Sequence, residues 1–457
     1  MKKIAIIGCG LIGTSILMTI IKYGQSVSSI TVFDNNPKTE DLVFQRLQDE
    51  NLDDSRVFFV SSIKEAVSNS DLIILASPID SFRALSYQIS LHAPKNAILT
   101  DMGSAKRISM SYIFEGISQS DILYVAAHNG NGSKGSGPMT ACTENIVGPN
   151  SYMFLVEGNT TSPGLLKAYK EVELFWNSLS TKTLRLDVDA HDRFFGKCSH
   201  LPHGIVFSLM IAAIENKDVS RNFMLAGTAL RNLSRIALDK DNNNGFSALL
   251  KMWLPIFMHN KTAILESAIQ FEYRLNLLIS AIKSDDKARI QSMLLKAREY
   301  RSSFQEEDLR ECLDGEFYDI EQTITSETLH DNRIEHDYSS LLASNVLLPC
   351  IISYAQVMGA FDNNPDFISQ YAPASFRDGT APSLYCHEKI ADLLTQHRRN
   401  VLRSIESFLT SFKDFLIALE RDDIDTLERF IISAPTIRNL MPSPRKGADT
   451  REKFRCT

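Results

Sequence analysis

Three histidines and one arginine occupy positions from which they could act on a small anionic molecule. His128 directly follows an apolar, strand-like run at 122–126, and a neutral imidazole there, with an ordinary pKa near 6.5, can take a proton from a substrate hydroxyl. Arg235 offers a planar guanidinium that can bind a carboxylate through two parallel hydrogen bonds. The sequence therefore predicts a general base and a carboxylate-binding residue.

The other two histidines, His200 and His203, allow a second interpretation. Histidines three residues apart can share one helix face and bind a metal, but no acidic residue or third histidine has a motif-like position near them. The chain has 7 cysteines at scattered spacings, which favours neither a zinc knuckle nor a disulfide framework. We expect no metal site and a reducing, cytoplasmic location.

A glycine-rich turn near the N-terminus is typical of dinucleotide binding. It lies between a strand-like run at 3–7 and helical spacing that extends to about 23, which are the elements that such a turn requires. The glycines would allow a tight turn, close approach of the backbone to a pyrophosphate and close helix packing. The residues that we expect to bind the cofactor here are Gly8, Gly10, Leu11, Ile12 and Gly13.

Asp34 adds the second part of this signature. It follows the strand-like run 29–33, where a carboxylate would accept hydrogen bonds from the adenosine ribose and repel a 2′-phosphate. NAD is therefore the expected cofactor, and NADP is less favoured.

The elements that must position these residues divide the chain into two textures. Further strand-like runs at 57–60, 71–76 and 97–100 alternate with helical segments, which predicts an α/β Rossmann-type, doubly wound parallel sheet. From about residue 190 the pattern is amphipathic helix, so an all-α part should follow. We expect a dinucleotide-binding domain at 1–180, a helical substrate and dimerisation-type domain at 181–304, and a further helical domain at 320–457.

Composition limits the partners. The chain of 457 residues has 44% hydrophobic and 23% charged residues, and its net charge of −7 is spread without long blocks of one sign. Nucleic acid and anionic membrane surfaces are therefore not expected as partners. No run reaches the roughly 18 uninterrupted apolar residues of a membrane helix. A small-molecule substrate fits best.

The helical part contains a candidate repeat. An offset of 137 residues pairs Phe271 with Phe408 and Asp285 with Asp422, whereas upstream Arg231 and Arg377 differ by 146. An insertion in the polar stretch 239–245 would explain the difference of nine residues. We favour a diverged tandem copy over chance similarity between helical segments.

Four segments, at 100–106, 128–138, 191–203 and 231–237, resemble in order the signature segments of the prephenate dehydrogenase family. The resemblance extends from residue 1 to about 304. Members of that family oxidatively decarboxylate prephenate, or in some cases arogenate, with NAD or NADP, on the route to tyrosine. The resemblance implies that His128 is the catalytic histidine, that Ser104 contacts it and the substrate, that His203 lines the substrate site and that Arg235 binds a substrate carboxylate.

Three departures from the family pattern flank this site. Asn129 stands where a proline is usual, Lys134 where an acidic residue is frequent, and Asn232 where an aspartate is common. They bear on the identity of the substrate more than on the class of reaction. A prephenate dehydrogenase is expected, and an arogenate dehydrogenase or a tailoring dehydrogenase for an aminated, prephenate-like intermediate stays open. A non-catalytic dinucleotide-binding regulator is a remote alternative, because the implied site residues are present.

The second copy bears on assembly. In the resembled family, the helical domains of two subunits interlock into a dimer, so a covalently attached copy could cover the same apolar surface. We expect a monomer that is internally a pseudo-dimer, with an ordinary homodimer as the alternative. Aligning Ser199 with Ser344 would place Leu348 at His203, and the offset of 146 places Ala381 at Arg235. The copy would thus have lost its substrate groups.

Overall fold

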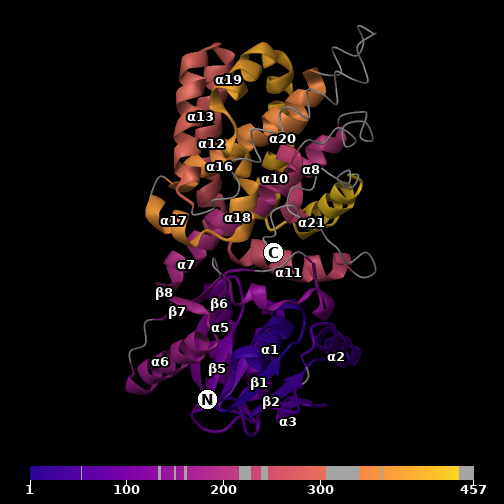
Figure 1. Cartoon of the computed structure of the whole chain (residues 1–457), viewed down its shortest axis with the longest axis vertical. Helices are drawn as coiled ribbons and strands as arrows, with labels where there is room; N and C mark the ends of the chain where they lie inside the picture. The colour runs from indigo at the N-terminus through magenta and orange to yellow at the C-terminus, as the bar shows by residue number, and fades with distance from the viewer. Residues whose placement is uncertain are drawn as a thin grey trace. The chain divides into compact units, whose positions relative to one another are not determined.

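The computed structural model describes residues 1–52, 54–131, 135–148, 151–158, 162–215, 228–237, 245–304, 339–361 and 364–441. Lys134, most of the suggested insertion at 239–245 and the start of the expected third domain at 320 lie outside these residues. The chain forms two compact units (Figure 1), Met1–Phe195 with Asp239–Asn260, and Gly196–Leu238 with Lys261–Thr457.

An eight-stranded sheet forms the centre of the first unit, in the order β3-β2-β1-β4-β5-β6-β7-β8. Its strands are β1 (Lys3–Ile7), β2 (Ser29–Phe33), β3 (Val57–Phe59), β4 (Leu72–Leu75), β5 (Ile98–Asp101), β6 (Leu123–Asn129), β7 (Tyr152–Glu157) and β8 (Lys182–Asp187). All neighbouring strands are parallel except β6 and β7. The Rossmann-type sheet predicted from the sequence is confirmed, but the prediction of a wholly parallel sheet is wrong, because β7 reverses direction.

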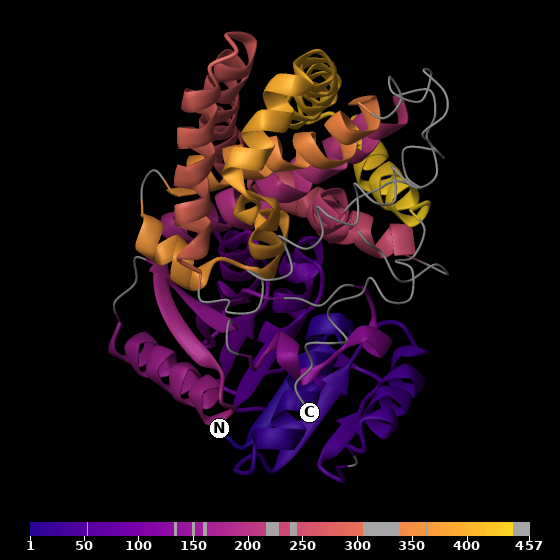
Figure 2. The ribbon, with the colours of Figure 1, turned by 45° about the horizontal axis from the view of Figure 1, so that its top comes forward.

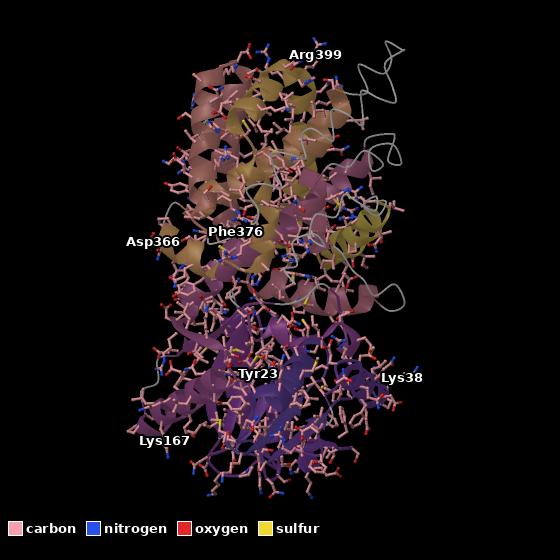
Figure 3. The ribbon with its side chains drawn as sticks, viewed as in Figure 1. Tyr23, Lys38, Lys167, Asp366, Phe376 and Arg399 are labelled. Carbon is pink, nitrogen blue, oxygen red and sulfur yellow. The ribbon has the colours of Figure 1, made fainter. Side chains whose placement is uncertain are left out.

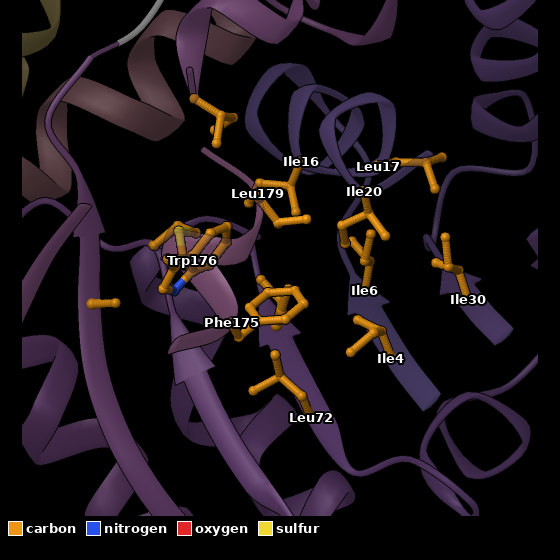
Figure 4. Packing of buried hydrophobic residues seen from close by; sticks show 14 of the residues in the cluster. Ile4, Ile6, Ile16, Leu17, Ile20, Ile30, Leu72, Phe175, Trp176 and Leu179 are labelled. Atoms are coloured by element: carbon orange, nitrogen blue, oxygen red, sulfur yellow. The ribbon is translucent and has the colours of Figure 1, made fainter. Parts of the chain in front are cut away.

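The helices of this unit cover both faces of the sheet. They are α1 (Leu11–Tyr23), α2 (Thr39–Asp49), α3 (Ile63–Val67), α4 (Phe82–Ser90), α5 (Lys106–Ile117), α6 (Pro163–Ser178), α7 (Val188–Phe195) and α11 (Gly245–His259). Figure 4 shows one side of the core, where Ile4 and Ile6 of β1 lie under Ile16 and Ile20 of α1, in the same buried cluster as Trp176 of α6. Alternate residues of each strand face this cluster, which holds α1 and the turn before it in place.

The second unit is helical (Figure 2). Its first run contains the π-helical turn η4 (Gly196–His200), α8 (Leu201–Glu215), α10 (Thr228–Leu233), the 3-10 turn η5 (Ser234–Ala237), α12 (Lys261–Lys283) and α13 (Lys287–Ser302). Its second run contains the π-helical turn η7 (Ala343–Leu347), α16 (Leu348–Phe361), α17 (Pro365–Tyr371), α18 (Ala374–Gly379), the 3-10 turn η8 (Ala381–Leu384), α19 (His387–Gln396), α20 (Arg398–Glu420) and α21 (Ile424–Asn439). Figure 3 labels Phe376 of α18, which is fully buried, and Arg399 of α20, which is exposed.

The two runs show the same succession of elements. Helices α12 and α20 each have 23 residues, and α13 and α21 each have 16. The turns between them match as well, since Asp285 and Asp422 have positive φ angles of 58° and 55°. The next residue caps the following helix in both turns, where Asp286 accepts a hydrogen bond from a backbone amide and Asp423 does the same.

The first helices of the two runs correspond differently from the sequence alignment. Each π-helical turn leads into a helix whose second residue is proline, Pro202 in α8 and Pro349 in α16. Proline is tolerated in the first turn of a helix, so it marks this position better than a matching serine does. The alignment of Ser199 with Ser344 is therefore wrong, and the residue at the position of His203 is Cys350 rather than Leu348.

The contacts between the two runs are reciprocal. Helix α12 packs against α16, and α20 packs against α8. The Lys261 ammonium lies 2.7 Å from the Asp422 carboxylate, and the residues at the corresponding positions, Arg398 and Asp285, form the second ion pair at 3.3 Å. Such exchange of equivalent partners is the pattern of an isologous, two-fold interface.

Two helical stretches, Val188–Ile214 and Ser339–Phe361, are long and apolar enough to cross a membrane by composition alone. In each, most of the apolar window is buried within the protein, 72% and 89% respectively. They have the character of core helices.

Candidate active site

The glycine turn between β1 and α1 has the geometry of a cofactor cradle. Gly8 has a φ of 92°, and a Cβ atom there would lie 2.9 Å from the backbone of Ala76. At Gly13 a Cβ atom would lie 2.0 Å from the carbonyl oxygen of Gly8, so both positions require glycine. At Gly10, by contrast, a Cβ atom would have no neighbour within 4 Å. The backbone is thus open in front of α1, where a diphosphate could approach the helix N-terminus.

Asp34 lies at the end of β2 and is fixed against this turn. Its Oδ2 accepts a hydrogen bond from the Cys9 amide at 2.7 Å, and its Oδ1 accepts bonds from the Asn36 amide and the Thr39 hydroxyl at 2.9 and 3.2 Å. The remaining predicted residues of the turn, Leu11 and Ile12, begin α1 and are partly buried. The carboxylate therefore stands beside the cradle, as a ribose-binding group would.

His128 lies near the end of β6 and is almost completely buried, with 6% of its surface exposed. Its Nδ1 lies 2.9 Å from Nε2 of His191, and Nδ1 of His191 lies 2.9 Å from Oδ1 of Asp192. The two carboxylate oxygens of Asp192 also accept hydrogen bonds from the amides of Lys106 and Arg107, at 2.8 and 2.9 Å. A continuous chain of hydrogen bonds thus connects the first turn of α5 to His128.

The charges along this chain determine which nitrogens carry protons. Burial acts to raise the pKa of Asp192, but the hydrogen bond and charge of His191 and the two amides outweigh it and hold that pKa below its usual value. Burial lowers the pKa of His191 more than the neighbouring carboxylate raises it, so the ring is neutral. His191 Nδ1–H therefore donates to Asp192, His128 Nδ1–H donates to His191 Nε2, and the lone pair of His128 is on Nε2.

Aromatic rings surround these two imidazoles. The ring of Phe195 lies 4.3 Å from that of His128 and 4.6 Å from that of His191, between centroids, and Phe154 lies 6.2 Å from His191. The amide of Asn260 donates to the carbonyl oxygen of Asp192 at 2.9 Å. The histidine pair is thus held rigidly in a surrounding of low dielectric constant, which strengthens its hydrogen bonds.

A buried ion pair supports the loop that carries Ser104. Lys106 is fully buried, and its ammonium lies 2.6 Å from Oδ2 of Asp101, whose Oδ1 accepts a hydrogen bond from the Tyr124 hydroxyl at 2.7 Å. Ser104 itself is partly buried between β5 and α5. The partner of His128 Nδ1 is His191 rather than Ser104, so the implied contact between Ser104 and the catalytic histidine stays a prediction.

The second unit holds the other two predicted residues. His203, on α8, donates from Nδ1 to the carbonyl oxygen of Ser199 at 2.8 Å, and its burial lowers its pKa to about 4. His203 is therefore neutral at physiological pH, with its lone pair on Nε2. His200 is buried as well. Among the described residues, no three histidine, cysteine or acidic side chains group together as metal ligands would.

Arg235, on η5, has a partner from the second run of helices. One of its guanidinium nitrogens lies 3.4 Å from Oδ2 of Asp378, on α18, and both side chains are partly exposed. Asp378 stands at the position that corresponds to Asn232 in the first run. The sequence analysis did not assign a role to Asp378, or to His191 and Asp192, although all three adjoin residues that it singled out.

Two family models match this chain, and they match different parts of it. Residues 27–172 match the nucleotide-binding domain of prephenate dehydrogenase, and residues 187–296 match its dimerization domain. The second match ends before η7, so the run from η7 to α21 lies beyond both models.

Individual proteins extend this comparison. Over 312 residues the chain is 28% identical to prephenate dehydrogenase of Lactococcus lactis subsp. cremoris, covering 67% of this chain and 78% of the relative. Over 287 residues it is 24% identical to cyclohexadienyl dehydrogenase of Zymomonas mobilis, covering 62% and 90%.

Solved structures show the same fold. A Synechocystis arogenate dehydrogenase superimposes with a TM-score of 0.51 at 20% identity, covering 66% of this chain and 99% of that one. A prephenate dehydrogenase from A. aeolicus, in complex with hydroxyphenyl propionate and NAD+, superimposes with a TM-score of 0.50 at 23% identity, covering 63% and 92%. With both halves of the family's architecture matched in order along one chain, this protein belongs to the prephenate dehydrogenase family.

Proposed function

We propose that this chain is an enzyme that oxidatively decarboxylates prephenate to 4-hydroxyphenylpyruvate with NAD, in tyrosine biosynthesis. The hydrogen-bond chain from Asp192 through His191 to His128 carries the proposal, because it leaves a neutral imidazole with its lone pair on Nε2. A base of this kind is what the oxidation of a secondary alcohol requires.

The reaction needs one proton transfer and one hydride transfer. His128 Nε2 takes the proton of the 4-hydroxyl group while the hydride leaves the carbon that bears it. NAD, when bound, accepts this hydride. The bond from the ring to its carboxylate then breaks, carbon dioxide leaves with the ring becoming aromatic, and the proton returns to the phenolate oxygen. The positive charge that His128 carries in between is stabilised through His191 by the carboxylate of Asp192.

The residues around the glycine turn fit a bound NAD. The open backbone at Gly10 would hold the diphosphate at the start of α1, and Asp34 would accept hydrogen bonds from the adenosine ribose. A carboxylate at this position repels the 2′-phosphate of NADP. We therefore infer a preference for NAD.

Substrate binding falls to residues of both units. Arg235 binds a carboxylate of prephenate, and His203 and Ser104 line the same site. The resemblance of their sequence segments to the family signatures supports these three roles. The neutral state of His203 adds support, because a neutral imidazole can exchange hydrogen bonds with a substrate without competing for its charge.

Arogenate is the second candidate substrate. The carboxylate of Asp378, 3.4 Å from Arg235, places an anion beside a cation, and an amino-acid side chain presents the complementary carboxylate and ammonium. Prephenate has a keto group in place of that ammonium, so it would leave Asp378 without this contact.

An absorbance assay tests the function directly. Purified protein is mixed with prephenate or arogenate and with NAD or NADP, and nicotinamide reduction is followed at 340 nm together with the release of carbon dioxide. We expect the fastest reduction with prephenate and NAD, with one carbon dioxide released for each NADH formed. Failure of all four combinations would refute the proposed function.

We also infer a monomer with one active site for each chain, in which 1–180 forms the dinucleotide-binding domain, 181–304 the helical domain and 320–457 a degenerate copy of it. The matched helix lengths and the reciprocal ion pairs of Lys261 and Arg398 support this arrangement. A homodimer is the alternative. The described cysteines form no disulfide, which fits a cytoplasmic enzyme.

A further inference from the structure

The last helix of each run buries an arginine at the same position. Arg301, on α13, and Arg438, on α21, are 137 residues apart, and they are 1% and 8% exposed. Taking a guanidinium out of water is costly unless hydrogen bonds or an opposite charge compensate for it. Each arginine should therefore have a partner in the folded protein.

Arg301 has such partners. Its Nη2 donates to the carbonyl oxygen of Arg377 at 2.9 Å, and its guanidinium lies 4.5 Å from the ring centre of Phe304. Arg377, in turn, donates from Nε to the carbonyl oxygen of Ala372 at 2.9 Å. Backbone carbonyls thus hold the arginines on this side of the pseudo-dimer.

Arg438 is in a different environment. Within the described part of the chain, its guanidinium makes no hydrogen bond and no ion pair, and its Nε is buried without an acceptor. Helix α21 packs against α8 and η5, and Met441 Sδ lies 3.9 Å from the hydroxyl of Ser234, the neighbour of Arg235. This packing brings the end of α21 to the segment that carries the proposed carboxylate-binding residue.

The neighbours of Arg438 add to its need for an anion. Burial, and after it the positive charges of Arg231 and Arg235, lower the pKa of Arg438 to about 10. Three guanidinium groups thus gather around one point with the single carboxylate of Asp378 near Arg235. The net charge of this group is about +2, which matches a substrate with two carboxylates.

The two sides of the pseudo-dimer differ in a consistent way. On the side of Arg438, the first run keeps His203 and Arg235. On the side of Arg301, the corresponding positions hold Cys350 and Ala381. The arginine without a partner in the described structure therefore faces the side that has kept its substrate-binding groups, and the arginine with backbone partners faces the side that has lost them.

We propose that Arg438 binds a carboxylate of the substrate together with Arg235, so that the second copy of the helical domain supplies a substrate-binding residue to the one active site. The copy then completes the site as well as covering an apolar surface. This inference rests on the proposed function of Arg235 in the same site.

The test compares Arg438→Met with Arg301→Met, which removes the same group from the corresponding position on the other side. For Arg438→Met, the KM for prephenate should rise by about 10- to 100-fold, the usual loss for a charged hydrogen-bond partner, while the KM for NAD is unchanged and kcat changes little. Arg301→Met should keep the wild-type KM for prephenate. A wild-type KM in Arg438→Met, or an equal rise in both variants, would overturn the proposal.

Two further measurements keep the test independent of folding and of activity. Arg438→Lys retains the charge but loses the planar fork, so its KM for prephenate should rise by about 5-fold or more, and an unchanged KM would refute the assignment even if Arg438→Met does not fold. In thermal denaturation, prephenate should raise the melting temperature of the wild type and of Arg301→Met but not that of Arg438→Met. If the wild type is stabilised in this way yet does not oxidise prephenate, the proposed function fails while the arginine site stands. If Arg438→Met is stabilised like the wild type, the arginine site fails.

Discussion

The ring of Phe271 lies 6.4 Å from the ring of Phe408, the residue that occupies the same position in the corresponding helix 137 residues later. In a two-fold interface, a residue meets its own counterpart only near the symmetry axis. The pair therefore marks a pseudo-two-fold axis between α12 and α20, about which the ion pairs of Lys261 and Arg398 exchange. The second run of helices contacts the first as a partner subunit would.

The first prediction concerns mass in solution. Light scattering coupled to size-exclusion chromatography should give one species near 51.3 kDa, because the surface that a second subunit would cover is covered within the chain. A species of twice that mass at micromolar concentration would contradict the pseudo-dimer. Truncation after Ser303 should cause aggregation or new dimers, and a soluble, active monomer from that truncation would count equally against it.

The second prediction concerns the hydrogen-bond chain. Asp192→Asn removes the carboxylate that fixes the proton on His191 Nδ1, which allows the opposite tautomer and so places a proton on Nε2 of His128. We expect kcat to fall on the order of 10²-fold with the KM for NAD unchanged. Asp189→Asn is the matched control, because this exposed carboxylate lies on the same helix α7 and pairs with Arg107 at the surface. Equal activity in the two variants would exclude the chain from catalysis.

The third prediction concerns acid stability. His203 has a pKa of about 4 in the folded protein, whereas an unfolded histidine has about 6.5. Between these values the unfolded chain binds more protons, so stability must fall as the pH falls from about 6.5 toward 4, by at most about 1.4 kcal/mol per pH unit from this residue. Melting temperatures at pH 7.0 and 5.0, a pair of values on the order of those limits, should differ less in His203→Gln than in the wild type. The same difference in both proteins would contradict the buried, neutral state of His203.

The fourth prediction separates the two candidate substrates. If Asp378 offers its carboxylate to an ammonium group, Asp378→Asn should reduce kcat/KM for arogenate by about 10-fold and leave that for prephenate within about 3-fold. Arg235→Gln should raise the KM for both substrates, because both carry carboxylates. A larger loss for prephenate than for arogenate in Asp378→Asn would show that the carboxylate serves only to orient Arg235.

Much of the first unit could be predicted from the sequence. The strands at 3–7 and 29–33 are continuous apolar runs because parallel strands are buried on both faces, and β1 and β2 have these bounds in the structure. The reversal at β7 could not be predicted, because the direction of a strand depends on its neighbours and leaves no local pattern. The glycine turn was recognised because three glycines have a steric reason to be there.

The site was predictable only as far as single motifs allow. His128, His203 and Arg235 stand in recognisable segments, but the role of His191 depends on a contact across 63 residues. Arg438 has no motif at all, and its nearness to Arg235 follows from the packing of α21 on η5. The available signal was the offset of 137 from Arg301, which becomes informative once the environments of the two arginines are compared.

The central claim is that His128 removes the hydroxyl proton as hydride leaves, and the most direct test is the rate of NADH formation from prephenate by His128→Asn. This variant should bind NAD as the wild type does and keep its melting temperature within a few degrees, since asparagine can still donate to His191. Its kcat should fall on the order of 10²- to 10⁴-fold, the usual contribution of a positioned base. Turnover at the wild-type rate in a folded His128→Asn variant would contradict the account.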